Sequence, residues 1–325
     1  MNLGKASTLV CTMALAALLL PVHAWAQGAY PDKPVRLIVP FPPGGTTDVV
    51  GRLTAAKVSA LWGKTIVVEN KSGASGTIGT GEGIAAPADG YTLTVGNSQT
   101  HGTNAALFPK LKYDLINDVQ PIAMLARTKN VLAVSANAPY RSVEALIDAG
   151  KTRPLSYASV GNGSSSHIIG EFISRKHGLT TTHVPYRGGS PALVDLIGGQ
   201  VDFMAATYGS VATFVKDGRI RVLAVSDEVR DPRMPGVPTF KEAGLPSLGL
   251  DTTIGLYAPA GVPREIVNQW SSALAKVVTM PDFATTLESA GFEVGFKPVE
   301  EFEKFHRQEV PRLGAIIREA NVEMN

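Results

Sequence analysis

The sequence predicts an α/β protein with parallel or mixed sheets. Apolar, β-branched runs typical of strands alternate with segments whose apolar residues recur at helical spacing. Several strands end in glycine-rich loops that open into helices, as in Val35 to Asp48, which reads VRLIVPFPPGGTTD. In such sheets ligands bind at the carboxyl ends of strands, where these loops fall. The length of 325 residues and an apolar fraction of 44% indicate two domains.

The first residues have the parts of a secretory signal peptide. Lys5 precedes an apolar run from Leu9 to Leu20, and residues 24–26 read Ala-Trp-Ala before Gln27. That run is too short to span a membrane, and no later stretch reaches about 18 continuous apolar residues. We therefore expect cleavage after Ala26, which makes residues 1–26 the signal peptide and leaves a soluble, exported protein. The alternative is an uncleaved anchor.

Composition excludes several classes of site. The only cysteine, Cys11, lies in the predicted signal peptide, so disulfides, thiolate metal sites and cysteine nucleophiles are excluded from the mature chain. The full chain carries 30 Lys and Arg against 28 Asp and Glu, which gives no electrostatic case for a nucleic-acid partner. None of the 6 histidines falls in an H-E-x-x-H motif, so we expect no metal site and no cofactor.

The stretch from Pro42 to Asp48 carries the strongest functional signal. It follows a strand predicted over 35–39; its two prolines end that strand, and its two glycines permit close approach to the backbone. The three residues after the glycines are N-cap candidates for a helix predicted over 48–62. The free N–H groups and partial positive charge of a helix N-terminus suit a small anion such as a carboxylate. The alternative is an ordinary strand-to-helix turn, and Asp48 is a structural cap under either interpretation.

A second glycine-rich loop, over 71–83, follows a strand predicted over 65–68. Neither glycine-rich loop has the G-x-G-x-x-G order of a dinucleotide site or the G-K-[ST] of a P-loop, so nucleotide binding is not expected. A strand predicted over 91–95 then opens into the polar loop 96–104, which is a candidate pocket wall. His101 in this loop is either a pocket residue or an ordinary surface histidine.

The same arrangement recurs in the middle of the chain. Strands predicted over 155–159 and 183–185 each lead into a glycine-rich loop and a helix, and further strands are predicted over 201–205 and 221–225. The polar break from Arg127 to Asn130, between two β-type runs, is the first candidate crossing between the domains.

The C-terminal part is predicted to return the chain to the first domain. A strand over 253–258 begins this return, with the second crossing near Leu250 to Thr253. Helices are then predicted over 263–278, 281–290 and 298–318, with a strand over 293–296. The expected division is residues 27–128 and 253–325 for the first lobe and residues 129–252 for the second.

Two side-chain sets leave alternatives open. The loop 161–166 either presents serine hydroxyls and amides to a ligand or simply caps the next helix. A secreted serine hydrolase using Ser165 and His167 is the enzyme alternative, although no G-x-S-x-G elbow occurs. Arg187, beside two glycines, either pairs with a carboxylate or stays solvated. The sequence does not decide between these interpretations.

Four motifs together resemble a known family. PFPPGGTTD, NKSGASGTIGT, SVGNGSSSH and VPYRGGSPALVDLIGGQVD occur in family order over the chain from about Tyr30. The chain resembles the Bug family of substrate-binding receptors of tripartite tricarboxylate transporters. The resemblance implies a two-lobed, type II (Venus-flytrap) periplasmic binding protein, with a mixed sheet in each lobe and a ligand cleft between them. It also implies a non-enzyme that delivers a small carboxylate to membrane permease subunits, and we expect a monomer.

The resemblance also implies site residues. The first-lobe contacts would be Pro43, Gly44, Gly45, Thr46, Thr47, Ser98, Gln99, Thr100 and His101. The second-lobe contacts would be Ser159, Gly163, Ser164, Ser165, Tyr186, Arg187 and Asp202. The loops 97–102 and 207–210 are expected to choose among di- and tricarboxylates, acidic amino acids and aromatic carboxylates. In the second of these loops, Tyr208 would stack on an aromatic ring or simply pack between the lobes.

Overall fold

The computed structural model describes residues 30–245 and 248–320. The predicted signal peptide and its cleavage site after Ala26 lie outside these residues. The chain divides into an N-terminal unit that ends at Asp32 and a unit that begins at Lys33, and the strands and helices named below belong to the second unit. Over the residues described, no helix is both long and apolar enough to cross a lipid bilayer.

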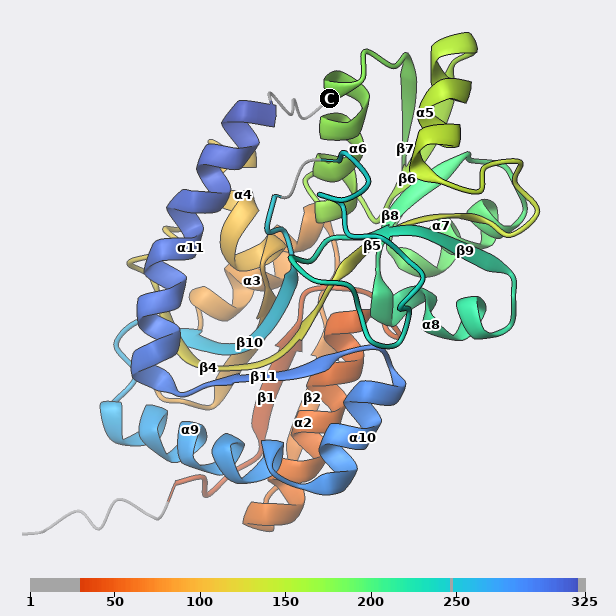
Figure 1. The fold of residues 1–325 in the computed structure, drawn as a ribbon. Helices are drawn as coiled ribbons and strands as arrows, with labels where there is room; N and C mark the ends of the chain where they lie inside the picture. The colour runs from red at the N-terminus through yellow and green to blue at the C-terminus, as the bar shows by residue number, and fades with distance from the viewer. Residues whose placement is uncertain (1–29, 246–247, 321–325) are drawn as a thin grey trace, which may run out of the picture. The chain divides into compact units, whose positions relative to one another are not determined.

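The first sheet has six strands in the order β11-β4-β10-β3-β1-β2. It is mixed, because β1 pairs parallel with β2 and β3, whereas β10 and β11 join by antiparallel pairing. Its strands are β1 Val35–Val39, β2 Ile66–Asn70, β3 Thr92–Asn97, β4 Val119–Thr128, β10 Thr252–Pro259 and β11 Glu293–Lys297. The helical segments of this part are α2 Thr46–Trp62, η1 Ala74–Gly76, α3 Thr77–Ile84, η2 Gln99–Thr103, α4 Asn104–Leu107, α9 Arg264–Val278, α10 Pro281–Ser289 and α11 Val299–Ala320. Figure 1 shows the blue C-terminal strands lying beside β4, so the end of the chain completes the sheet that its start begins.

The second sheet has five strands in the order β7-β6-β8-β5-β9. It is also mixed, with β6 parallel to β7 and β8 and with β5 antiparallel to β8 and β9. Its strands are β5 Asn130–Ser135, β6 Leu155–Ser159, β7 Thr181–Pro185, β8 Phe203–Thr207 and β9 Ile220–Val225. Its helices are α5 Val143–Thr152, α6 Ser165–Lys176, α7 Gly189–Ile197 and α8 Tyr208–Lys216. The predicted fold class, an α/β fold with a mixed sheet in each of two lobes, is confirmed.

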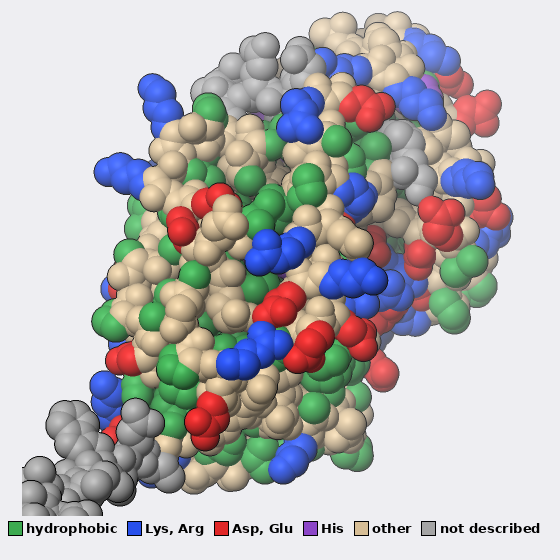
Figure 2. All heavy atoms as spheres, turned by 90° about the vertical axis from the view of Figure 1, so that its left-hand side faces the viewer, with side chains coloured by type: hydrophobic (Ala, Val, Ile, Leu, Met, Phe, Trp, Pro, Cys, Tyr) green, Lys and Arg blue, Asp and Glu red, His purple; other side chains and the backbone are tan. Residues whose placement is uncertain are grey.

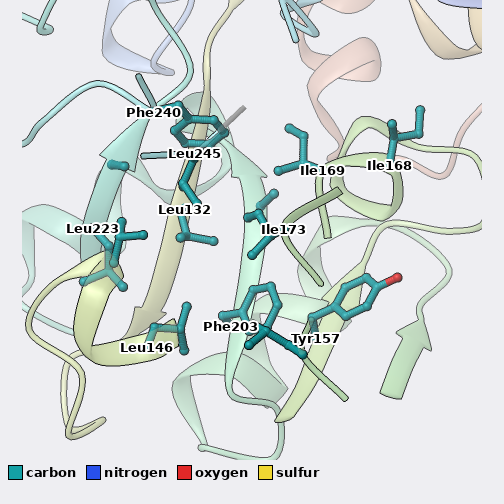
Figure 3. Packing of buried hydrophobic residues seen from close by; sticks show 14 of the residues in the cluster. Leu132, Leu146, Tyr157, Ile168, Ile169, Ile173, Phe203, Leu223, Phe240 and Leu245 are labelled. Carbon is teal, nitrogen blue, oxygen red and sulfur yellow. The ribbon is translucent and has the colours of Figure 1, made fainter. Parts of the chain in front are cut away.

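Both faces of the second sheet are buried. Val131 and Ala133 of β5 pack with α7 and α8, whereas Leu132 and Val134 pack on the opposite face with α5 and α6. This division follows from the alternation of side chains along a strand. Figure 3 shows the second of these faces, where Leu132 lies near Ile173 of α6. Burial on both faces explains why the strand reads as a continuous apolar run.

The chain passes from the first sheet to the second at Lys129, because β4 ends at Thr128 and β5 begins at Asn130. It returns just before Thr252, the first residue of β10.

The C-terminal helix α11 also contacts both lobes. Its early turns pack on β4, and the side chains of Leu313 and Ile317 join the core cluster of the second lobe.

The surface over α11 and α9 is shown in Figure 2, where basic and acidic side chains are interspersed. Arg264 of α9 donates hydrogen bonds to Glu300 and Glu303 of α11 at 2.8 and 2.5 Å. The Arg264 side chain is 45% exposed, so solvent screens these pairs and each adds little to stability. The packing of α11 therefore depends mainly on its buried apolar side chains.

Three local predictions are corrected by the structure. Helix α2 begins at Thr46 with Gly45 as its N-cap, so the N-cap is none of the three residues expected. The segment expected as a loop over 96–104 contains a π-helical turn, which Thr103 N–H closes by donating to the Ser98 carbonyl at 3.0 Å. Helix α8 begins at Tyr208, within the segment expected to be a variable loop. In each case local backbone hydrogen bonds give polar residues a regular conformation.

Candidate functional site

Asp48 stabilises the conformation of the loop between β1 and α2. Its carboxylate accepts hydrogen bonds from the Gly44 amide and Asn70 Nδ2, both at 2.8 Å, and from Arg52 Nε at 3.0 Å. Burial alone would raise the pKa of Asp48, but the hydrogen bonds from Arg52, Asn70 and the Gly44 amide outweigh it and hold the pKa below its usual value. Gly44 adopts φ +81°, a left-handed conformation that glycine accepts without strain.

This arrangement leaves the start of α2 available to a ligand. The Gly45 N-cap forms no side-chain capping bond, and among the described residues no acceptor is recorded for the amides of Gly45, Thr46 and Thr47. A helix N-terminus without a cap carries partial positive charge and free donors. It is therefore suited to an anion.

The end of β3 forms the next part of the wall. Asn97 Nδ2 donates to Thr47 Oγ1 at 3.1 Å, and Asn97 Oδ1 accepts the amide of Gln99 at 3.0 Å. Ser98 Oγ donates to the Asp251 carbonyl at 3.2 Å. These bonds fix the polar side chains of the first lobe against α2 and against the start of β10.

The second lobe presents three further helix N-termini. Ser164 caps α6, where its Oγ accepts the His167 amide at 3.3 Å, and Ser165 Oγ donates to Asn130 Oδ1 at 3.1 Å. Helices α7 and α8 begin after Gly188 and Thr207, neither of which makes a side-chain capping bond. At the start of α8 the amides of Tyr208 and Gly209 already donate, to the Lys129 carbonyl at 2.8 Å and to Thr128 Oγ1 at 3.3 Å, so the free backbone donors of the second lobe come mainly from α6 and α7.

These parts enclose a cavity of about 530 Å³ between the lobes. Residues from the first turns of α2, α6, α7 and α8 all line it, so four helix N-termini meet at one space. Arg187 and Asp251 are the charged residues among its described lining residues, and Phe41, Val160 and Phe292 are among the apolar ones. Arg187 is exposed and makes no recorded polar contact within the described part of the chain.

Many of the residues predicted for the site lie in this wall. They are Pro43, Gly44, Gly45, Thr46, Thr47, Ser98, Gln99, Ser164, Ser165 and Arg187. The lining residues that the sequence did not single out as contacts include Phe41, Asn97, Gly188, Ser190 and Asp251. Gly188 directly follows Arg187 and Ser190 comes two residues later, so their place in the glycine-rich stretch YRGGSPA could have indicated them. Asp251 lies in the stretch predicted as the second crossing between the lobes, but its place in the cavity wall depends on the pairing of β10 with β3.

Other residues implied by the resemblance lie outside the cavity wall. Thr100 Oγ1 accepts the Asn97 amide at 3.0 Å, and the buried His101 ring stacks on Tyr257 with ring centroids 3.8 Å apart. Burial lowers the pKa of His101 well below its usual value, so this ring is neutral at pH 7. The helical turn directs both side chains into the first lobe, where Thr100 is hydrogen-bonded and the His101 ring packs on Tyr257, although no partner within the described residues bonds His101 Nε2.

In the second lobe, Ser159 Oγ bonds with His183 Nε2 at 2.7 Å, and Tyr186 donates to Asp195 Oδ2 at 2.6 Å. The Tyr208 ring is buried with Arg233 4.4 Å from its centroid, rather than facing the cavity. These three predicted residues therefore have partners within their own lobe.

Gly163 and Asp202 also lie outside the wall. The Gly163 carbonyl accepts a bond from Thr103 Oγ1 at 3.1 Å, which joins the two lobes beside the cavity. Asp202 directly precedes β8, at the opposite end of that strand from the cavity residue Thr207. It accepts bonds from Arg153 and, at 2.8 Å, from Tyr140, so it organises the far edge of the lobe.

The geometry gives no support to the hydrolase alternative. Ser165 donates to Asn130, whereas His167 Nδ1 accepts the Gly163 amide at 3.1 Å. Within the described residues, no hydrogen bond joins Ser165 to His167, the pairing by which a base activates a serine nucleophile.

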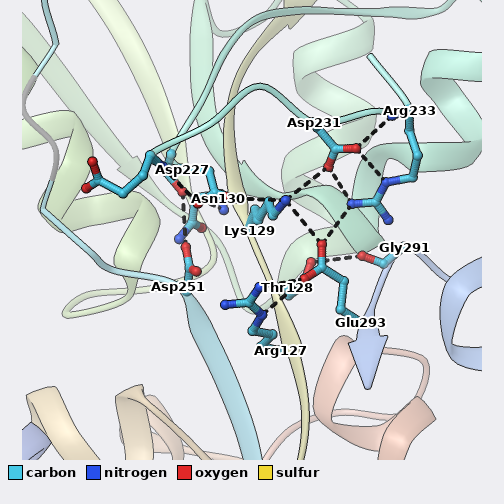
Figure 4. Close-up of polar contacts among 12 residues, drawn as sticks. Arg127, Thr128, Lys129, Asn130, Asp227, Asp231, Arg233, Asp251, Gly291 and Glu293 are labelled. Carbon is cyan, nitrogen blue, oxygen red and sulfur yellow. Dashed lines mark hydrogen bonds and ion pairs between the residues drawn. The ribbon is translucent and has the colours of Figure 1, made fainter. Parts of the chain in front are cut away.

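A network of buried charges lies where the chain crosses between the lobes (Figure 4). Lys129 Nζ lies 2.7 Å from Asp227, 3.6 Å from Asp231 and 3.2 Å from Glu293 of β11, and its side chain is only 7% exposed. Burial alone would lower the pKa of Lys129, but bonds to Asp227 and Glu293 raise it above its usual value. Hydrogen bonds from Arg233 lower the pKa of Asp231 to about 2. The network therefore ties β11 of the first lobe to the second lobe.

Comparison with known proteins identifies relatives over nearly the whole chain. Residues 50–322 match the model of the tripartite tricarboxylate transporter family receptor. The chain is 30% identical to the Bordetella pertussis protein BugT, over 96% of each chain.

Comparison with solved structures also identifies relatives over most of the chain. A Rhodopseudomonas palustris protein, Rpa4515 with adipate, is 33% identical and superposes with a TM-score of 0.85 over 90% of this chain and 99% of that one. MatC from the same organism, with bound malate, is 32% identical with a TM-score of 0.82 over 89% of this chain and 100% of that one. Adipate and malate, the molecules present in those two structures, are both dicarboxylates.

Proposed function

This chain belongs to the tripartite tricarboxylate transporter receptor family, and from that premise we propose that it captures a small carboxylate between its lobes and delivers it to a membrane permease. The convergence of four helix N-termini on one cavity carries the proposal, because free amides and aligned helix dipoles stabilise an anion without a cationic clamp. The dicarboxylates in Rpa4515 and MatC support the same ligand chemistry. We further propose that the receptor is an exported monomer, cleaved after Ala26, and that it has no catalytic activity.

The ligand would be held by both lobes. From the first lobe we propose the loop 43–47 with Ser98 and Gln99, and from the second Ser164, Ser165 and Arg187. Because contacts come from both sides, ligand should favour the closed arrangement of the lobes. The cavity volume of about 530 Å³ lies within the range of small-molecule sites.

A thermal-shift screen against a carboxylate panel tests this function. Binding to the folded state raises the apparent melting temperature, because free ligand at a hundredfold excess over Kd stabilises the folded state by about 2.7 kcal/mol. We expect at least one small carboxylate to raise it and its amide or methyl ester to have no effect. Recovery of that ligand chemically unchanged after incubation would support binding without catalysis. A full panel of mono-, di- and tricarboxylates without any shift would contradict the proposal.

Removing the guanidinium of Arg187 should weaken carboxylate binding only modestly. Arg187→Ala is expected to weaken carboxylate binding by no more than about tenfold, because the exposed guanidinium is screened by solvent. Isothermal titration calorimetry measures the change, and Arg141→Ala, also exposed but outside the cavity wall, is the matched control. A loss above about a hundredfold would instead indicate a buried charge-assisted contact in the complex.

A further inference from the structure

Four successive residues just before α3 have positive φ angles. They are Gly73, Ala74, Ser75 and Gly76, with φ of +138°, +44°, +55° and +83°. Glycine adopts such angles freely, but Ala74 and Ser75 are strained by them, because their Cβ atoms crowd the backbone in the left-handed region. They are the two non-glycine residues recorded with positive φ in the part of the chain that the structure describes. Strain of this kind persists where surrounding contacts hold it in place, and it clusters at functional positions.

The strained turn allows Ser75 to bond with both lobes. Its carbonyl accepts a hydrogen bond from Asn104 Nδ2 at 3.0 Å, within the first lobe. Its Oγ donates to the Asn162 carbonyl of the second lobe at 2.9 Å, across 87 positions of the chain. Thr77 Oγ1 supports the turn by donating to the Ala74 carbonyl at 2.8 Å. Ser75 is therefore fixed in the first lobe while its hydroxyl reaches the second.

The loop that precedes α6 receives two further bonds from the first lobe. Gln99 Nε2 also donates to the Asn162 carbonyl, at 3.2 Å, and Thr103 Oγ1 donates to the next carbonyl, that of Gly163, at 3.1 Å. The loop leads directly into Ser164, the N-cap of α6, which lines the cavity. Three first-lobe side chains therefore hold one edge of the ligand site in place.

Ser75 differs from the other two donors because it lies outside the cavity wall, whereas Gln99 and Thr103 line it. Loss of the Ser75 hydroxyl would therefore remove a bond between the lobes without removing a contact to the ligand. Ser75 also lies outside the segments in which the chain crosses between the lobes, at Lys129 and just before Thr252. Its bond can therefore form when the lobes close and break when they separate.

We propose that Ser75 is a positioning residue that latches the two lobes together around a bound ligand. This inference rests on the proposed function, because a ligand held by both lobes binds tightly only when they are closed. The apparent affinity falls in proportion to the fraction of the protein that is closed. One hydrogen bond changes the ratio of closed to open protein by about three- to tenfold. The strained turn orders the hydroxyl in advance, so closure costs little further entropy there.

Hydrogen–deuterium exchange followed by mass spectrometry tests the latch in the ligand-free protein. The amides of Gly163 and His167 donate to His167 Nδ1 and Ser164 Oγ, so exchange of residues 160–167 reports on the loop that Ser75 holds. Ser75→Ala should accelerate this exchange by about three- to tenfold, although the substituted residue belongs to the other lobe.

A second variant and a control separate the latch from local structure. Ser75→Gly removes the same hydroxyl and also relieves the strain of a positive φ. Its ligand-free melting temperature should equal or exceed that of the native protein, while exchange of residues 160–167 still rises. The matched control is Ser289→Ala, because Ser289 Oγ donates to the Thr286 carbonyl of its own helix at 2.9 Å. The control should leave exchange of residues 160–167 unchanged.

Calorimetry with adipate and with malate measures the effect on binding. Both Ser75 variants should bind each dicarboxylate about three- to tenfold more weakly than the native protein, and Ser289→Ala should bind as the native protein does. Faster exchange with unchanged affinity would overturn the positioning role of Ser75. Equal exchange in the native protein and in both Ser75 variants would overturn the latch whether or not a dicarboxylate binds. Failure of the native protein to bind any carboxylate would count against the proposed function instead, because the exchange measurement needs no ligand.

Discussion

Gly45→Val is expected to abolish ligand binding while leaving the fold intact. Gly45 lies in the cavity wall with φ −77° and ψ 169°, angles that any residue can adopt. An added Cβ would meet only the Pro42 carbonyl within 4 Å, at 3.7 Å, so the isopropyl group has room but projects where the helix amides must meet an anion. We expect affinity to fall at least about a hundredfold, equivalent to about 2.7 kcal/mol. Stability should fall by no more than about 1 kcal/mol, since valine is a poor N-cap.

The matched control is Gly236→Val. Gly236 is exposed, lies outside the cavity wall, and has no atom within 4 Å of an added Cβ. Calorimetry measures affinity, and circular dichroism checks that both variants are folded. If Gly45→Val is folded and binds normally while Arg187→Ala loses all affinity, binding depends on the arginine and not on the amides.

Features that depend on adjacent residues were predictable from the sequence. The strand, Pro-Pro-Gly-Gly loop and helix around Gly44 form a continuous stretch whose turn, free amides and helix start follow from residue type. The structure brings this loop into the cavity wall, where it had been expected. The repeated strand, glycine loop and helix in the second lobe was predictable for the same reason, and it supplies the N-terminus of α6.

Features that depend on distant pairing were not predictable. Asp251 reaches the cavity because β10 returns between β3 and β4, a pairing between residues far apart in the chain. Asp202 illustrates the converse, because it directly precedes β8, the strand whose other end meets the cavity. The burial of His101 against Tyr257 likewise depends on β10 and could not be inferred from the polar sequence around it.

Lys129→Met is expected to lower the free energy of unfolding by about 3–5 kcal/mol, the typical cost of removing one partner from a buried ion pair. Methionine fills a similar volume, so the loss would come from charge and not from a cavity. It leaves Asp227 without the lysine that pairs with it, whereas Glu293 keeps Arg127 and Arg233, and Asp231 keeps Arg233. Urea unfolding followed by circular dichroism at pH 7 measures the effect. Lys151→Met, which removes an exposed pair with Asp148, should cost no more than about 1 kcal/mol.

The pH dependence of stability distinguishes the contribution of the Lys129 charge from that of its packed methylene chain. The pKa of Asp231 is about 2 in the folded protein against its usual 3.8, so the stabilisation it receives is complete above pH 4 and is lost as the pH falls through 2. Arg233, which the variant keeps, is the main cause of this lowering. Burial alone would raise the pKa of Asp227, but the hydrogen bond from Lys129 outweighs it and holds the pKa below its usual value. The stability difference between the native protein and Lys129→Met should therefore be largest near pH 7 and shrink as Asp227 is protonated. A difference that stays constant from pH 7 down to pH 2.5 would show that Lys129 contributes through its packed methylene chain instead.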